Sequence, residues 1–227
     1  MRGLSLEPMD ALVMSDLHLG SKASRARDAI RLLGSRPFCR LILLGDVFCD
    51  LNLHRLGRAD WQFLACLRKL SAGKAGVEVV WVEGNHDRAL MPLMSRLLGL
   101  KAQQEYMWEF RGSRHLALHG HQFDDVPATT FLPSGLIVGA VAHASRRGAH
   151  RVLCGHTHQA LEVELNGIGY FNSGAWCGSH PTYIAIDDDG VQIRTVLGEP
   201  QAQGDSRSSR RLRPITHWPI GSAEAAG

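Results

Sequence analysis

The sequence predicts an α/β fold in which at least some of the strands are parallel. Short apolar runs rich in branched residues alternate with longer stretches of helical periodicity, and the apolar runs repeatedly end at glycine, aspartate, histidine or asparagine. Alternating strands and helices favour parallel pairing, because each helix carries the chain back across the sheet. The composition agrees, since 227 residues with 44% hydrophobic and 21% charged side chains can bury a core, which excludes collagen-like, coiled-coil and wholly disordered chains.

The predicted strands and helices alternate through the first part of the chain. We expect helices over 24–34 and 60–70. The second would begin with Asp60 as its N-cap and place Trp61, Leu64 and Leu67 on one face, as core rather than as a base-stacking surface. The predicted strands cover residues 11–14, 41–44, 77–82, 115–118 and 151–154.

The part after Gly155 is predicted to be mainly antiparallel. Asn166-Gly167 is a two-residue turn that strongly favours a hairpin, and 187–190 separates a further pair of apolar runs. The strands expected around these two turns are 161–165 with 168–172, and 182–186 with 191–196.

The composition changes at Gly198, after which apolar residues become few. We therefore expect one domain over residues 1–198 and a flexible basic tail over 199–227. The tail is expected to be solvated, and the alternative is a contact with phosphate or lipid headgroups through Arg207, Arg210, Arg211 and Arg213.

Charge and cysteine content favour a cytoplasmic protein with an anionic substrate. The net charge of +3 is mildly basic and well below that of a dedicated nucleic-acid binder. The five cysteines form no CxxC pair, which suits reduced thiols. Glu7, Pro8 and Asp10 interrupt the apolar stretch that a signal peptide would need. The oligomeric state is not predicted.

An uncharged stretch over 126–145, followed by Arg146 and Arg147, predicts a further helix. Its apolar face suits a core-packing or lid helix, and the alternative is a peripheral membrane contact. The residues that would share this face are Leu132, Leu136, Ile137 and Val141.

Polar clusters follow each of the five predicted strands. Ligands of α/β proteins bind outside the carboxyl ends of strands, so these clusters can meet at one site. Asp16 and His18 stand two residues apart, as do His156 and His158, which in extended chain points both side chains of a pair the same way. The clusters are Ser15-Asp16-Leu17-His18, Gly45-Asp46, Gly84-Asn85-His86-Asp87, His119-Gly120-His121 and Gly155-His156-Thr157-His158.

The residue types indicate a centre of two divalent metal ions. Carboxylate, amide and imidazole donors suit Mn²⁺, with Zn²⁺ or Fe²⁺ as alternatives. Two ions about 3.5–4 Å apart can generate a bridging hydroxide that attacks phosphorus while both ions stabilise the entering and leaving oxygens. The chemistry predicted is hydrolysis of a phosphodiester, pyrophosphate or phosphomonoester.

The motifs DxH, GD, GNHD, HGH and GHTH, in this order between Leu12 and Asn172, resemble those of the calcineurin-like metallophosphoesterase superfamily. The resemblance implies a four-layer sandwich of two mixed β-sheets flanked by helices. It also implies that Asp46 bridges both ions, that His86 acts on the leaving oxygen without binding metal, and that Asp87 orients His86. The ligand sets it implies are Asp16, His18, Asp46 and His158 for one ion, and Asp46, Asn85, His119 and His156 for the other.

Within the superfamily, SDLHLG, LLGDVF and LHGHQFDD are similar to the UDP-2,3-diacylglucosamine pyrophosphatase type. That type carries Arg and Asp where this chain has His86 and His121. Residue alternation turns His121 one position past the strand end, so it is left out of the ligand set, and the alternative is a substitute ligand or pocket acid. Three functions remain open: a phosphoesterase of small phosphorylated molecules, the lipid-linked nucleotide pyrophosphatase of lipid A synthesis, and a non-catalytic protein-binding scaffold.

Overall fold

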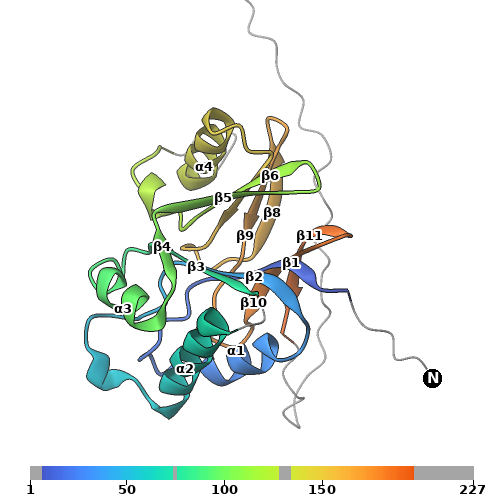
Figure 1. Ribbon diagram of the computed structural model, residues 1–227. Coiled ribbons are helices and arrows are strands. Elements are labelled where there is room, and N and C mark those ends of the chain that lie inside the picture. Colours follow the sequence, from blue (N-terminus) through green and yellow to red (C-terminus); the bar gives the residue numbers. More distant parts are fainter. Residues whose placement is uncertain (1–6, 74–75, 128–133, 197–227) are drawn as a thin grey trace, which may run out of the picture.

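The computed structural model describes residues 7–73, 76–127 and 134–196 of the chain. These residues form two β-sheets with helices on their outer faces (Figure 1). The α/β class and the sandwich of two mixed sheets are therefore as expected. The expected domain boundary at 198 and the tail over 199–227 lie outside the described residues.

The elements follow one another in an order that fills the first sheet, then the second, and then returns to the first. They are β1 (Met9–Met14), α1 (Ala26–Leu33), β2 (Phe38–Leu44), η1 (Leu53–Arg55), α2 (Arg58–Ala72), β3 (Glu78–Val82), α3 (Met91–Leu98), β4 (Lys101–Gln103), β5 (Glu105–Phe110), β6 (Ser113–Leu118), η2 (His121–Phe123), α4 (Gly135–Arg146), β7 (Arg151–Cys154), β8 (Leu161–Leu165), β9 (Ile168–Asn172), β10 (Thr182–Asp187) and β11 (Gly190–Thr195).

Each sheet has a parallel centre and an antiparallel margin. The first sheet has the order β11-β10-β1-β2-β3-β4, with β1 to β4 parallel. The second has the order β5-β6-β7-β9-β8, with β6, β7 and β9 parallel. The remaining neighbours pair antiparallel, including the predicted hairpins β8–β9 and β10–β11.

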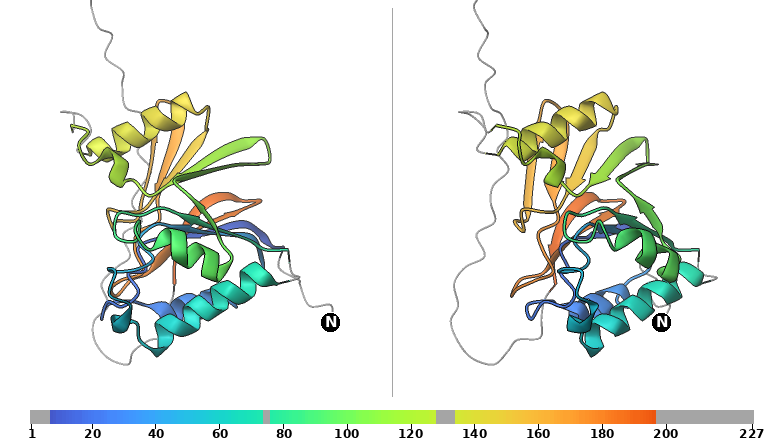
Figure 2. Two further views of the ribbon diagram at one scale, coloured as in Figure 1. Left: turned by 60° about the vertical axis from the view of Figure 1, so that its left-hand side comes forward. Right: turned by 90° about the vertical axis from the view of Figure 1, so that its left-hand side faces the viewer.

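Three apolar cores separate the four layers. One lies between the first sheet and helices α1, α2 and α3, a second lies between the sheets, and a third lies between the second sheet and α4. Figure 2 shows these layers from the side. Alternation along each strand produces the arrangement: in β1, Leu12 and Met14 face the helices, whereas Ala11 and Val13 face the other sheet.

The polar clusters follow the carboxyl ends of β1, β2, β3, β6 and β7, so both sheets contribute loops to one edge of the sandwich. Backbone hydrogen bonds hold neighbouring loops together. The amide of Asp16 donates to the carbonyl of Gly45 at 3.1 Å, and the amide of His18 donates to the carbonyl of Asp46 at 3.0 Å. The fold thus fixes the backbone of the predicted site before any ligand binds.

The beginning of α2 differs from the sequence prediction. The N-cap is Gly57, and Asp60 lies in the first turn, where its carboxylate accepts the amide of Gly57 at 2.8 Å. The prediction that Trp61 is a core residue is wrong, because its side chain is 51% exposed, whereas Phe63 and Leu64 are buried. The buried stripe of α2 runs through Asp60, Phe63, Leu64 and Leu67, and Trp61 lies beside this stripe on the solvent side.

Five elements were not predicted: α3, β4, β5 and the two short 3-10 helices η1 and η2. The predicted helix near 126–145 is α4, which buries Leu136, Ile137 and Val141 against the second sheet, while Leu132 lies outside the described residues. This burial agrees with the core-packing alternative. Within the ranges that the structure describes, every helix is too short or too polar to cross a bilayer.

A buried histidine in β6 makes the stability of the fold sensitive to acid. His115 is fully buried, stacks on Trp108 with ring centroids 5.0 Å apart, and burial together with the charge of Arg151 lowers its pKa to about 4. The ordinary histidine pKa in an unfolded chain is ~6.5. Between that pH and about pH 4, the unfolded chain therefore binds a proton at His115, whereas the buried ring of the folded protein stays neutral. The free energy of unfolding therefore falls as the pH drops through this window.

We expect the free energy of unfolding to decrease by about 2 kcal/mol between roughly pH 7 and pH 5 on account of His115 alone. Urea denaturation of the parent protein and of His115→Phe, which keeps an aromatic ring on Trp108, measures this contribution. The variant should lose that part of the pH dependence. An identical dependence in both proteins would contradict the assignment.

Candidate metal centre

Asp46, in the loop after β2, lies at the middle of the candidate site and is 1% exposed. Its Oδ1 accepts the backbone amide of His86 at 3.0 Å. Its Oδ2 lies 3.3 Å from Nε2 of His119 and 3.9 Å from Nε2 of His18. One carboxylate oxygen therefore faces histidines from both sheets, as a bridging ligand must.

The first group of donors beside Asp46 comes from the second sheet. His119 follows β6 and His156 follows β7, and one donor atom from each lies within 4.8 Å of Asp46 and of the other. The Nδ1 of His119 donates to the carbonyl of Leu44 at 2.8 Å, which leaves Nε2 toward Asp46. The structure thus brings together three of the four residues expected to hold the second ion.

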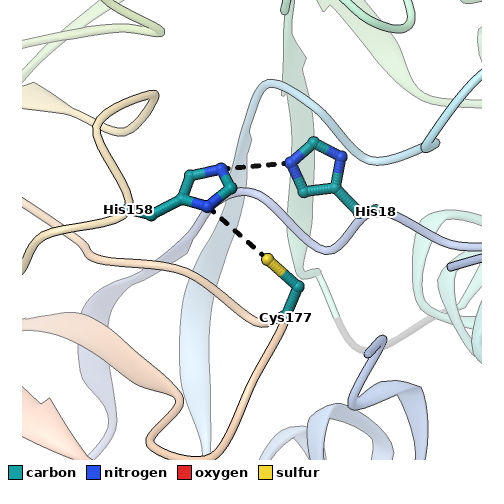
Figure 3. A group of neighbouring side chains, drawn as sticks. All are labelled: His18, His158 and Cys177. Carbon is teal, nitrogen blue, oxygen red and sulfur yellow. Dashed lines mark hydrogen bonds between the residues drawn. The ribbon is translucent and has the colours of Figure 1, made fainter. Parts of the chain in front are cut away.

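The second group comes from Asp16, His18 and His158. Nε2 of His158 lies 3.2 Å from Oδ1 of Asp16 and 3.2 Å from Nε2 of His18 (Figure 3). His18 belongs to the loop after β1, and His158 to the loop after β7. Residues 140 positions apart in sequence therefore meet at donor-to-donor distances suited to one ion.

Asn85 lies in the loop between β3 and α3 and is exposed. Its neighbours on either side are fixed, since Gly84 packs on Asp46 and the amide of His86 donates to the same carboxylate. The loop therefore carries Asn85 beside the group formed by Asp46, His119 and His156.

His86 has one ring nitrogen fixed and one directed at the centre. Its Nδ1 lies 2.8 Å from the carbonyl oxygen of Cys49, which can only accept, so Nδ1 carries a proton. Its Nε2 lies 3.9 Å from Oδ2 of Asp46. The side chain is 45% exposed, which leaves room for a substrate.

The expected orientation of His86 by Asp87 is not what the structure shows. Asp87 is fully buried, and its carboxylate accepts the backbone amides of Val47 at 2.6 Å and Gly84 at 3.1 Å. These bonds join the loops after β2 and β3. Asp87 is therefore a structural residue beneath the site, and the Cys49 carbonyl takes the role expected of it.

Three further residues near the site, His121, Asp50 and Asn52, make local contacts. His121 lies in η2 with its ring centroid 5.5 Å from that of His119, and its Nδ1 is buried without a partner among the described residues. The carboxylate of Asp50 accepts the amide of Asn52 at 2.8 Å and pairs with Arg55, so Asp50 and Asn52 form a turn.

The protonation of the site follows from its charges. Burial raises the pKa of the Asp46 carboxyl, but His119 and His86 outweigh it and lower that pKa to about 2. The Asp16 carboxylate and the Cys177 sulfur raise the pKa of His158 to about 10. Burial raises the pKa of Asp87 to about 6, despite its two amide donors. Asp46 is therefore ionised, and the centre carries the negative charge that a divalent cation requires.

Backbone strain is concentrated at the candidate ligands. Seven non-glycine residues of the described chain have a positive φ, and five of them belong to the candidate site. A residue with a side chain in this conformation costs of the order of 1–3 kcal/mol, and such positions gather at functional sites. The five are Asp16 (φ 54°), His18 (44°), Asp46 (51°), His156 (69°) and His158 (59°).

Glycine allows the loops to approach this closely. A Cβ on Gly84 would lie 2.2 Å from both the amide nitrogen and Oδ1 of Asp46, and one on Gly45 would lie 2.3 Å from Nδ1 of His119. Both contacts are shorter than any tolerable packing distance. Gly84 and Gly45 are thus needed to seat the bridging carboxylate against the opposite sheet.

The donor set fits divalent metal ions. Oδ1 of Asp16 and Nε2 of His119 are buried, and neither forms a well-directed hydrogen bond with the described residues, although Nε2 of His158 lies 3.2 Å from the first and Oδ2 of Asp46 lies 3.3 Å from the second. Buried polar atoms left in this way are costly unless another group completes them. Carboxylate, imidazole and amide donors without a required thiolate suit Mn²⁺, Fe²⁺ or Zn²⁺. The chain therefore offers two groups of donors that share Asp46.

Comparison with models of protein families identifies the superfamily of this chain. Residues 9–189 match the model of the calcineurin-like phosphoesterase superfamily domain. The chain belongs to this superfamily. The match spans the second sheet, the first sheet except its outer strand β11, and all five polar clusters. No curated protein matches the chain.

Solved structures share the fold of this superfamily member at low sequence identity. YfcE, a phosphoesterase from E. coli, is 19% identical with a TM-score of 0.56, covering 82% of this chain and 99% of its own. A novel archaeal phosphodiesterase is 18% identical with a TM-score of 0.54, covering 82% and 98%. A Vps29 mutant from Entamoeba histolytica is 17% identical with a TM-score of 0.51, covering 82% and 97%.

Three contacts that shape the site escaped the sequence analysis. The carboxylate of Asp124 lies 2.8 Å from Nε2 of His156, the carbonyl of Cys49 holds His86, and the sulfur of Cys177 lies 3.6 Å from Nδ1 of His158. No spacing rule connects these pairs. Only the first aspartate of LHGHQFDD, which is Asp124, hinted at a charged residue near His119.

We expect Asp124→Ala to weaken binding of one metal ion about 10–100-fold, because the carboxylate fixes the ring of His156, which has a donor atom within 4.8 Å of Asp46 and His119. Competition with a chromophoric chelator measures the two affinities. Asp125→Ala, at the exposed neighbouring position, is the matched control and should bind both ions normally. Equal affinities in both variants would show that Asp124 does not position His156.

Proposed function

We propose that the chain is a phosphoesterase that uses two divalent metal ions held at the shared edge of its sheets. The observation that carries this proposal is the placement of Asp46 Oδ2 between His18 from the first sheet and His119 from the second. Manganese is the ion we favour, with zinc or iron as alternatives. The two sets, which share Asp46, are Asp16, His18, Asp46 and His158, and Asp46, Asn85, His119 and His156.

When bound, such ions activate water and stabilise the charge that develops on phosphoryl oxygens. The side chains of the protein supply the negative charge, the fixed position of the donors and the proton donor. Asp46 and Asp16 provide negative charge in a buried setting, and the strained loops hold the donors in place without reorganisation. His86 presents Nε2 on the open side, and because Nδ1 is already committed to Cys49, any second proton of this ring lies at Nε2.

A proton at Nε2 of His86 is placed for transfer to the leaving oxygen of a phosphate ester. The ring is half-exposed and its Nε2 lies 3.9 Å from Oδ2 of Asp46, so it reaches the substrate side of the centre. His86 is therefore proposed as a catalytic residue. The opposing possibility, that His86 binds metal with His18 and Asp46, rests on the proximity of these three donors.

A cavity of about 390 Å³ reaches His121, whose ring lies against that of His119, although none of the proposed metal ligands lines it, and we propose that it receives the part of the substrate that leaves. Arg88, His121 and His143 line it together with Glu83 and Glu105. A lining with both signs of charge favours a polar group with hydrogen-bonding hydroxyls or amides. We therefore favour a phosphodiester or a nucleotide-linked pyrophosphate over a simple monoester.

Two other functions follow from particular observations. The SDLHLG and LHGHQFDD motifs support the UDP-2,3-diacylglucosamine pyrophosphatase of lipid A synthesis as a specific alternative. The similarity to a Vps29 structure, at a TM-score of 0.51, shows that this fold also occurs in a protein that is not named as an esterase. A non-catalytic scaffold would not need strained, closely packed donors, and their presence favours the enzyme.

The proposal predicts hydrolysis that depends on the centre. The purified protein, stripped of metal and reloaded with Mn²⁺, Zn²⁺ or Fe²⁺, is assayed on aryl phosphate mono- and diesters, nucleotide pyrophosphates and UDP-diacylglucosamine. Asp46→Asn keeps the side-chain shape but lacks the charge, so it should bind less of both ions and lose activity on every substrate. Activity confined to the UDP-lipid would establish the specific alternative. A fully loaded protein inactive on the whole panel would favour the scaffold.

We expect His86→Ala to retain both metal ions while turnover falls about 10²–10⁴-fold, because only the proton donor is lost. Elemental analysis and steady-state kinetics on the same preparation separate the two effects. His54→Ala, at an exposed position of η1, is the matched control and should keep normal turnover. Unchanged turnover would remove His86 from the mechanism, and loss of one ion would make it a ligand.

A further inference from the structure

Three histidines of the candidate centre have one ring nitrogen held by an oxygen atom: His86 and His119 by carbonyl oxygens, and His156 by the carboxylate of Asp124. The other nitrogen of His86 and of His119 faces Asp46. Metal-binding histidines commonly use such a partner to fix the tautomer and the orientation of the ring. The remaining question is what holds His158.

The atom beside the second nitrogen of His158 is a sulfur. Nε2 of His158 lies 3.2 Å from His18 and 3.2 Å from Asp16, whereas Nδ1 lies 3.6 Å from Sγ of Cys177. Figure 3 shows the two contacts leaving different nitrogens of the ring. Cys177 therefore stands where the other histidines have an oxygen acceptor.

The fold fixes the position of this sulfur. Cys177 follows Trp176, which is fully buried, donates its amide to the carbonyl of Asp16 at 3.0 Å and accepts the amide of Arg25 at 2.9 Å. Cys177 itself forms an antiparallel bridge with Ser24. The segment after β9 is thus tied to the first sheet on both sides of Cys177.

We propose that Cys177 is a positioning residue for His158, whose Nδ1–H donates to the cysteine sulfur so that the Nε2 lone pair points at the metal ion. The inference rests on the metal centre proposed above. Nothing in it requires a sulfur–metal bond. Asp16 and His18 lie at Nε2 of His158, whereas the sulfur lies at Nδ1. The opposing possibility, that the sulfur is itself a ligand about 2.3 Å from an ion, rests on the proximity of the donor atoms of His18, His158 and Cys177.

Substitution of Cys177 tests the role through metal binding. Cys177→Ala should weaken binding of one of the two ions about 10–100-fold and leave the other unchanged. Cys177→Asp, which restores an acceptor, should recover part of the loss. Cys39→Ala, at an exposed position of β2, is the control and should bind both ions normally. Retention of the second ion shows that each variant is folded.

The cobalt-loaded protein distinguishes positioning from direct ligation. A cobalt–thiolate bond gives an intense near-ultraviolet charge-transfer band, which the proposal expects to be absent from the parent protein. Cys177→Ala should instead alter the weaker visible ligand-field bands, because the ring of His158 is no longer fixed.

Two results would overturn the proposal: a charge-transfer band that disappears in Cys177→Ala, which would make the cysteine a ligand, or unchanged affinities in that variant. Neither measurement involves hydrolysis. A protein that binds two ions but cleaves no phosphate ester would contradict the proposed function and still test the role of Cys177.

Discussion

The structure depends on one buried carboxylate at the edge where the two sheets meet. Burial of a charge is costly unless surrounding groups compensate for it. The loops around Asp46 provide this compensation through the amide of His86 and the ring of His119, which belong to different sheets. Asp16 plays a similar part, since its Oδ2 accepts the amide of His156 and its carbonyl accepts that of Trp176. The same contacts therefore neutralise the carboxylates and lock the two sheets together at the site.

The two nitrogens of a supported imidazole ring have different roles at the site: one is held by a supporting atom, and the other is left to act at the centre. A ring nitrogen that binds a carbonyl, a carboxylate or a sulfur cannot turn away, so the opposite nitrogen keeps its direction in the absence of any ion. Donors prepared in this way need little rearrangement when charge develops during a reaction. The support comes from backbone as often as from side chains: Leu44 and Cys49 act through their carbonyl oxygens. A substitution at either position would preserve the contact, whereas one at Asp124 would remove it.

Much of the fold follows from sequence pattern because the central strands are buried on both faces. Their apolar runs are continuous, and each ends where a polar cluster begins, which also predicted the donors that the structure brings together. β4 and β5 escaped prediction, since the former is a three-residue edge strand, Lys101–Gln103, and the latter carries glutamates at Glu105 and Glu109. Asp87 was misjudged because sequence proximity to His86 says nothing about competing backbone amides. Asp124 and Cys177 lie 32 and 19 positions from their histidines, beyond any local spacing rule.

The left-handed backbone at five donor positions opposes two properties of this chain, metal binding and stability. The donor side chains are needed to bind metal, but their strained backbone lowers the free energy of unfolding. Glycine would relieve the strain at each of these positions. A laboratory selection for thermostability alone would therefore favour substitutions that remove the metal ligands. Improvement of the scaffold should instead be sought far from this edge, for example around Leu93 and Leu97 of α3, whose apolar side chains are 58% and 60% exposed. The same reasoning applies to evolution. In a homologue that no longer needs to bind metal, we expect these five strained positions to be among the first replaced by glycine.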